Sequence, residues 1–165
     1  MALHTIEQLT QLATRALELA GASEHAARLT ARALVASDTQ GLASHGLSRA
    51  AQYAGHLRHG RVNGTAAPAV TKRKGAAALV DAQEGLAFLA CDLAITEATA
   101  LAREFGISIV AVTNSYHAGV LVDRLRAVAE AGLVGLGFAN APAANTRSSA
   151  PTRSRPSSRG ATTCR

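Results

Sequence analysis

Residues 107–114 have the sequence ISIVAVTN, and this apolar, β-branched run decides the expected fold. Such a run is typical of a fully buried strand, because it has no polar face. A helical stretch over residues 86–105 precedes it, and another over residues 120–131 follows it. The sequence LVGLGFAN at residues 133–140 then indicates a second buried strand. Strand, helix and strand at this length predict a right-handed parallel crossover, so the expected fold class is α/β.

Three helices are predicted before this unit. Apolar residues at three- and four-residue spacings indicate a first helix over residues 5–20, with Thr5 as its N-cap. A second helix is expected to begin at Ser23, which can cap it. A third begins near Leu47 and is stopped by Gly60. The chain is therefore expected to open with a helical unit.

Composition divides the chain into three parts. A helical N-terminal unit is expected over residues 1–64, and a partial α/β unit over residues 65–141. Residues 61–74 have loop or edge-strand composition, and a short apolar stretch follows at residues 76–80. Residues 142–165 form an aperiodic tail rich in Arg, Ser and Pro.

The formal net charge of +6 would by itself suggest nucleic acid as a partner. The excess charge, however, lies in the tail, which has no acidic residue, so the rest of the chain is nearly neutral. The tail arginines are Arg147, Arg153, Arg155, Arg159 and Arg165. Aromatic residues, which stack on bases, make up only 3% of the chain, so nucleic-acid binding is not expected.

Targeting, metal and disulfide signals are missing from the sequence. No apolar run approaches the roughly 20 residues needed to cross a bilayer, and the first ten residues do not resemble a signal peptide. A cytoplasmic protein without membrane contact is expected. Cys91 and Cys164 stand in unrelated settings, which predicts neither a zinc site nor a disulfide.

The string DTQGLASHGLSRAAQY at residues 38–53 is a candidate site. Two glycines bracket Ser44 and His45, which suits a tight loop holding an imidazole in one pose. Arg49 and Tyr53 lie four residues apart and project from one face of a helix. A histidine to exchange a proton, an arginine to bind a carboxylate and a phenol to orient the substrate would suit an oxo or hydroxy acid.

A structural interpretation of the same string stays open. In it, Ser44 caps the helix, His45 is a satisfied loop residue and Arg49 covers a helix face. His56 and His59 are three residues apart and could nominally bind a metal, but no further ligand completes a set. A solvated helix end is the better interpretation of that pair, and no metal site is predicted.

A second candidate string, NSYHAG at residues 114–119, follows the predicted strand directly. Ligands of α/β sheets collect beyond the carboxyl ends of strands, so His117 stands where a catalytic residue is expected. A helix beginning after Gly119 would point its amides at the same place and favour an anionic group. The chain has neither a GxGxxG nor a P-loop motif, and the glycines of residues 132–137 are weak evidence for a nucleotide site.

Three strings occur together in this order: DxxGxxSHGxxRxxxY, GISIVAVTNSYHAG and AGLVGLGFAN. Over roughly residues 5–141 the chain therefore resembles the malate/L-lactate dehydrogenase family, the non-Rossmann, NAD(P)-dependent type that includes ureidoglycolate dehydrogenase and diketogulonate reductase. The resemblance implies a helical unit followed by part of an α/β sandwich of the L-sulfolactate dehydrogenase-like type, truncated here. It also implies a homodimer that uses NAD or NADP, without metal, at C2 of a small 2-hydroxy or 2-oxo acid.

The resemblance further implies roles for single residues. The acid/base positions are His45 and His117, the substrate-binding positions are Ser44, Arg49 and Tyr53, and Asn140 falls near a cofactor-contacting strand end. Ala118 departs from the larger residue usual after this histidine, which changes the expected pocket wall. The resemblance places most nucleotide-binding residues after residue 141.

The tail is interpreted as an out-of-frame translation. Family members are expected to continue with a Gly-Thr-Asn-Pro-Ile-Ala string, which this chain lacks. Residues 147–159 can be encoded by codons, with suitably chosen third bases, that read in a shifted frame Leu-Phe-Gly-Thr-Asn-Pro-Ile-Ala-Ala-Val-Phe-Pro. We therefore predict a frameshift between about Ala141 and Asn145, and sequencing of the gene tests it. The other interpretation is a genuine disordered basic tail.

Two functions follow from the sequence. The first is an oxidoreductase that transfers hydride between NAD(P) and a small 2-hydroxy or 2-oxo acid, impaired in this chain by truncation. The alternative is a small basic binding module whose disordered tail binds nucleic acid or acidic partners.

Overall fold

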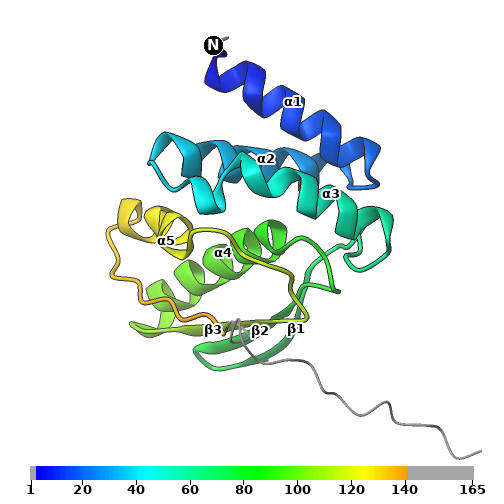
Figure 1. Cartoon of the computed structure of the whole chain (residues 1–165). Helices are drawn as coiled ribbons and strands as arrows, with labels where there is room; N and C mark the ends of the chain where they lie inside the picture. Colours follow the sequence, from blue (N-terminus) through cyan, green and yellow to red (C-terminus); the bar gives the residue numbers. More distant parts are fainter. Residues whose placement is uncertain (1–2, 141–165) are drawn as a thin grey trace, which may run out of the picture.

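The computed structural model describes residues 3–140 of the 165-residue chain. Its helices are α1 (Ile6–Leu19), α2 (Glu24–Thr39), α3 (Ala50–Arg58), α4 (Ala87–Phe105) and α5 (Leu121–Glu130), and its strands are β1 (Ala69–Lys74), β2 (Ala77–Asp81) and β3 (Ile109–Thr113). Two short 3-10 turns, Ala43–His45 and Leu47–Arg49, separate α2 from α3. Figure 1 shows the layers: α1 lies on α2 and α3, these lie above α4 and α5, and the sheet lies beneath α4.

Local signals at the helix ends match the prediction. The Thr5 side chain accepts a hydrogen bond from the backbone N–H of Gln8, and the Gln8 side chain accepts one from the Thr5 N–H, which is a capping box. The Ser23 side chain accepts a hydrogen bond from the Ala26 N–H at the start of α2. The third helix begins with a 3-10 turn at Leu47 and ends at Arg58, just before Gly60.

The sheet has the order β1-β2-β3. β1 and β2 form an antiparallel pair with an irregularity between Val70 and Lys72, whereas β2 and β3 run parallel, with Val80 opposite Val112. Helix α4 connects the two parallel strands. The predicted α/β class is confirmed, but the parallel crossover is β2-α4-β3, which lies one strand earlier in the chain than expected.

The predicted second buried strand is wrong. Residues 133–140 form no strand, and their large side chains point outward, with Val134 96%, Leu136 82% and Phe138 92% exposed. The glycines between them pack on α5, where a Cβ at Gly135 would lie 3.2 Å from Val128. A strand needs a hydrogen-bonding neighbour, and residues 133–140 pair with no strand of the described sheet.

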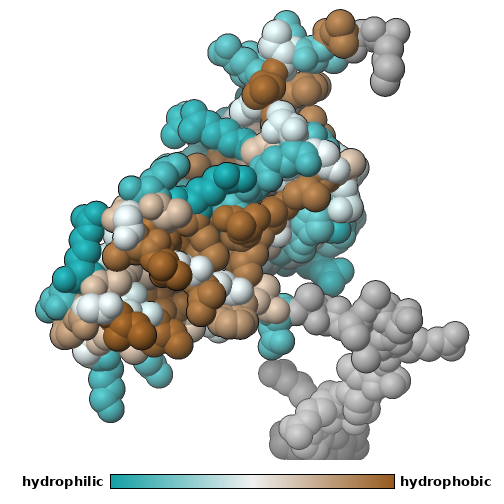
Figure 2. All heavy atoms as spheres, turned by 90° about the vertical axis from the view of Figure 1, so that its left-hand side faces the viewer, coloured by the Kyte–Doolittle hydropathy of each residue, from teal (hydrophilic) through white to brown (hydrophobic). Residues whose placement is uncertain are grey.

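The prediction that residues 107–114 are fully buried is also wrong. β3 is an edge strand of the described sheet, and α4 packs against only one of its faces. Ile107 is 74% exposed and Ile109 is 71% exposed. Figure 2, which shows the side of the molecule at the left of Figure 1, displays apolar side chains gathered over a broad surface. The apolar composition of residues 107–114 predicts burial, but the described residues leave these side chains partly or largely exposed.

Two apolar clusters hold the described residues together. The larger joins the helical layers and includes Leu17, Leu34, Tyr53 and Phe88 among its fully or almost fully buried side chains. The smaller lies between α4 and the sheet around Val80. The loops that carry both histidine strings are anchored on the larger cluster. Within residues 3–140, no helix is long and apolar enough to span a membrane.

Candidate functional site

The loop that carries His45 is held by Asp38, a residue to which the sequence assigned no role. The Asp38 carboxylate accepts a hydrogen bond from the Leu47 backbone N–H at 2.8 Å. Gly46 is buried against this carboxylate, and a Cβ at Gly46 would collide with it. The position of Asp38 at the start of the string was the available signal, but its partner lies nine residues away, beyond the reach of helical spacing rules.

Ser44, His45 and Arg49 form a connected group. The Ser44 hydroxyl lies 3.0 Å from Nδ1 of His45, and Nε of Arg49 donates to the Ser44 carbonyl oxygen at 2.5 Å. The structural alternative for Ser44 is wrong, because neither 3-10 turn has a side-chain cap. The bond from Nε leaves the two terminal nitrogens of Arg49 for other partners.

His117 lies directly beyond β3 in a segment fixed by backbone hydrogen bonds. The Glu84 N–H donates to the Asn114 carbonyl at 2.7 Å, and the Tyr116 N–H donates to the Gly85 carbonyl at 3.2 Å. Asn114 has a φ of 50°, and its side-chain amide donates to Asp81 at 3.1 Å. The end of β2 therefore positions the segment that follows β3.

The two predicted strings meet at His117. The Tyr53 hydroxyl on α3 lies 2.7 Å from Nδ1 of His117, across 64 residues of chain. The Gly119 N–H donates to the same nitrogen at 3.2 Å. The rings of His45 and His117 have centroids 5.6 Å apart, tilted by 31°. Tyr53 is completely buried, whereas both histidines are partly exposed.

The cluster is electrostatically positive. Burial lowers the pKa of His117, and the charges of Arg49 and His45 lower it further. Burial also raises the pKa of Tyr53 to about 12, although Arg49 acts in the opposite direction. An anion placed between the histidines and Arg49 would relieve this positive charge.

His56, which the sequence placed at a solvated helix end, instead supports the cluster. Its Nδ1 lies 2.5 Å from the Tyr116 hydroxyl, and the Tyr116 ring packs edge-on against Tyr53 at 5.3 Å. His59 is exposed, and its Nδ1 pairs with the Gly55 carbonyl at 2.7 Å. No group of three metal-binding side chains occurs within the described part of the chain.

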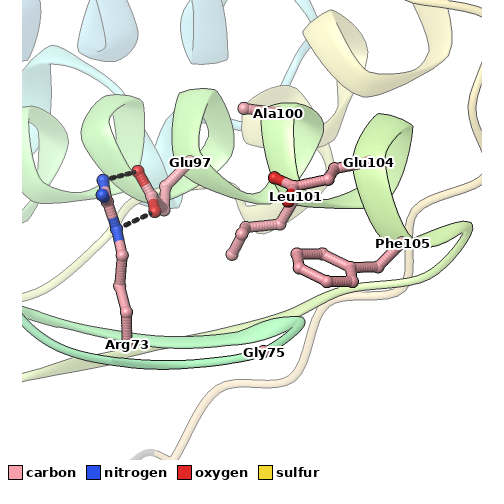
Figure 3. Close-up of a pocket in the computed structure, with 7 residues that line it drawn as sticks. All are labelled: Arg73, Gly75, Glu97, Ala100, Leu101, Glu104 and Phe105. Atoms are coloured by element: carbon pink, nitrogen blue, oxygen red, sulfur yellow. Dashed lines mark hydrogen bonds and ion pairs between the residues drawn. The ribbon is translucent and has the colours of Figure 1, made fainter.

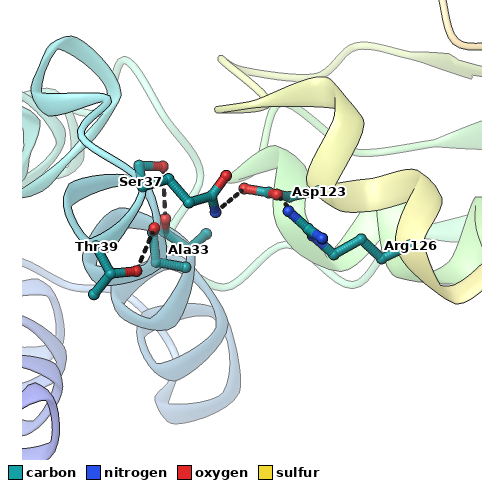
Figure 4. A network of polar contacts seen from close by, with 7 residues as sticks. Ala33, Ser37, Thr39, Asp123 and Arg126 are labelled. Atoms are coloured by element: carbon teal, nitrogen blue, oxygen red, sulfur yellow. Dashed lines mark hydrogen bonds and ion pairs between the residues drawn. The ribbon is translucent and has the colours of Figure 1, made fainter.

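Helix α5, which follows His117, is tied to the end of α2. Asp123 accepts a hydrogen bond from the Gln40 side-chain amide at 3.0 Å and pairs with Arg126 at 3.0 Å, as Figure 4 shows. Phe88 lies beneath the loop, because a Cβ at Gly119 would be 3.1 Å from its ring. The loop that carries His117 is thus held at both ends.

The structure does not bring Asn140 into this cluster. Asn140 is exposed, and no hydrogen bond within residues 3–140 joins it to the histidines. A pocket between the β1-β2 turn and α4 is bridged by the Arg73–Glu97 ion pair and contains no histidine (Figure 3). A second hollow is lined by residues 70–73. Neither pocket is lined by a residue of the histidine cluster.

The lowered pKa of His117 predicts a pH-dependent stability. The unfolded chain binds a proton near the ordinary histidine pKa of about 6.5, whereas the folded chain binds it only at lower pH. This contribution to stability is present above about pH 6.5 and is lost as the pH falls through the folded pKa. We expect urea unfolding to give a larger stability difference between about pH 7.5 and 5.5 for the wild type than for His117→Gln. The exposed His59→Gln variant should keep the wild-type difference, and an unchanged difference in His117→Gln would contradict the prediction.

Comparisons with known proteins agree on one family. The model of the malate/L-lactate dehydrogenase family matches residues 4–160. The chain is 41% identical over 140 residues to the (2R)-3-sulfolactate dehydrogenase (NADP(+)) of Chromohalobacter salexigens, covering 85% of this chain and 42% of that protein. The structure of malate dehydrogenase from Pyrococcus horikoshii superposes with a TM-score of 0.72 at 31% identity, over 77% of this chain and 36% of that one. Sulfolactate dehydrogenase from Methanocaldococcus jannaschii superposes with a TM-score of 0.70 at 28% identity, over 74% of this chain and 36% of that one.

The chain belongs to the malate/L-lactate dehydrogenase family. It spans about two fifths of the length of the curated relatives it matches. The family match runs to residue 160 and so enters the stretch for which the sequence predicts a frameshift. That stretch lies outside the described residues, and the frameshift stays a prediction.

Proposed function

We propose that this chain carries the acid-binding and proton-transfer residues of an NAD(P)-dependent dehydrogenase that acts on a small 2-hydroxy or 2-oxo acid. The observation that carries the proposal is the meeting of His45 and His117, from two distant strings, beside Arg49. The names of relatives support the substrate class, since they include sulfolactate and malate dehydrogenases and a pyrroline-carboxylate reductase.

Each residue has a proposed role. The terminal nitrogens of Arg49 bind the acid's carboxylate bidentately, in the geometry that guanidinium favours. Ser44 holds His45 through its hydroxyl and lines the same side of the site. One of the two histidines exchanges the proton of the C2 oxygen. Tyr53 belongs to the same cluster through its bond to His117.

The coenzyme, NAD or NADP, would supply or accept the hydride. This proposed role of the coenzyme is supported by the family and by a relative named (2R)-3-sulfolactate dehydrogenase (NADP(+)). We assign the described residues no step in hydride transfer, and the cofactor role of Asn140 rests on the resemblance alone. We propose little or no turnover of malate or lactate by the 165-residue chain, and robust turnover would contradict this.

The remaining proposals rest on the sequence. They are assembly as a homodimer, location in the cytoplasm and the division into units at residues 64 and 141. The alternative of a basic binding module is not favoured, because the family match covers most of the chain.

Binding of the acid tests the proposed function. Malate and 3-sulfolactate are titrated into the 165-residue chain, and histidine-ring NMR signals follow binding. We expect Arg49→Lys to weaken binding about tenfold or more, because lysine cannot form the bidentate pair. Arg58→Lys is the matched control, since Arg58 is an exposed residue at the end of α3, the helix that Arg49 precedes. Equal binding by Arg49→Lys and Arg58→Lys, or no binding by the wild type, would overturn the proposal.

A further inference from the structure

We propose that Tyr53 is a positioning residue that, with the Gly119 amide, keeps His117 neutral with its proton on Nε2. His117 then donates a hydrogen bond to the C2 oxygen of the acid, and His45 alone transfers the proton. This inference rests on the proposed function and divides the work between two histidines that the family resemblance leaves equivalent.

Nδ1 of His117 faces a backbone hydrogen-bond donor. The Gly119 backbone N–H points at this nitrogen from 3.2 Å. A backbone N–H can only donate, so the nitrogen that it faces must present a lone pair. A neutral imidazole with a lone pair on Nδ1 carries its proton on Nε2.

The Tyr53 hydroxyl is the donor in its hydrogen bond to His117. A hydroxyl can donate or accept, but beside a lone pair on Nδ1 it must donate. Burial raises the pKa of Tyr53 to about 12, so its proton is retained at any physiological pH. The phenol is completely buried and its ring is packed edge-on against Tyr116, which fixes its direction.

The two histidines differ in the group that faces Nδ1. Protonating His117 would place a hydrogen on Nδ1 against the Gly119 N–H, which cannot turn round to accept it. His45 has no such conflict, because its Nδ1 pairs with the Ser44 hydroxyl at 3.0 Å. That hydroxyl donates to neutral His45 and accepts from charged His45. His45 can therefore change its charge without losing its partner.

The proton step follows from this difference. When the oxo acid is reduced, the C2 oxygen takes a proton from the His45 imidazolium, which becomes neutral. When the hydroxy acid is oxidised, neutral His45 takes the same proton back. His117 keeps its Nε2 proton throughout and stabilises negative charge that develops on the oxygen. No hydrogen bond from another residue of the 3–140 range occupies this Nε2.

Nitrogen-15 NMR of the histidine rings tests the inference on the 165-residue chain without added acid. The His117 signals are assigned by their loss in His117→Gln. At about pH 7.5 we expect Nδ1 of His117 to have the shift of an unprotonated nitrogen and Nε2 that of a protonated one. A wild-type ring protonated on Nδ1 would overturn the inference, whether or not any variant folds.

Two variants then separate positioning from simple packing. Tyr53→Phe keeps the ring but removes the donated proton, and we expect the ratio of the Nε2–H to the Nδ1–H form of His117 to fall about fivefold. Tyr116→Phe is the matched control, since its hydroxyl pairs with His56, and it should change the His56 signals alone. Unchanged His117 signals in Tyr53→Phe would contradict the role of Tyr53.

The same spectra distinguish this inference from the proposed function. If malate and 3-sulfolactate do not bind while His117 carries its proton on Nε2, the proposed function fails and the assignment of the proton stands. If the acid binds and His117 becomes charged in the complex, the division of roles fails and the proposed function stands.

Discussion

Replacement of Phe88 by alanine is expected to lower the free energy of unfolding by about 3–5 kcal/mol. The Phe88 side chain is completely buried in the larger apolar cluster, at the start of α4. Its ring packs against Gly119, and the Arg124 guanidinium lies over it at 5.3 Å. The variant leaves a cavity at the point where α4 meets the His117 loop, and small domains have only about 5–15 kcal/mol of stability in total.

Phe105→Ala is the matched control for Phe88→Ala. It removes the same side chain from the other end of α4, where Phe105 is 47% exposed. We expect the free energy of unfolding to fall by about 1.5 kcal/mol or less. The Phe105 ring is already partly exposed, so its removal gives up less buried apolar surface. Urea unfolding followed by circular dichroism measures both variants. Similar losses at the two positions would show that Phe88 is not the anchor of the loop.

Gly46→Ala is expected to destabilise the protein by about 1–3 kcal/mol and to displace His45. An added Cβ would collide with the Asp38 carboxylate, which could avoid it only by leaving the Leu47 N–H. The loss of this bond frees the turn that sets the pose of His45. Urea unfolding gives the stability, and the ring signals of His45 report the displacement.

Gly55→Ala provides a control of opposite sign. Gly55 lies inside α3, and no atom lies within 4 Å of a Cβ added there. Alanine is the better helix former, so this variant should stabilise the protein by about 0.5–1 kcal/mol. A neutral effect of Gly46→Ala would mean that the Asp38 carboxylate moves aside freely, which would disprove its role in holding the loop.

The helices of the first sixty residues could be predicted because their signals are local. Thr5 caps α1 through Gln8, and Ser23 caps α2 through Ala26, each across three residues. Apolar periodicity indicates which face packs inward without any knowledge of the neighbour. The order of these helices therefore followed from the sequence alone.

The strand at residues 133–140 could not be predicted correctly from its composition. Apolar residues such as Val134 and Phe138 indicate burial, but they do not indicate what covers them. A strand exists only with a hydrogen-bonding neighbour, and the described sheet ends at β3. The same missing information made the ISIVAVTN run appear fully buried.

The sequence by itself determined the helix boundaries, the family and the two strings that supply His45, Arg49 and His117. Only the tertiary structure decided that Tyr53 pairs with His117 and that Asp38 holds the turn at Gly46. Helix caps and periodicity depend on contacts within three or four residues, which a sequence displays directly. The pose of His117 depends on a bond across 64 residues, and only folding of the helical layers against the loop after β3 brings its partners together.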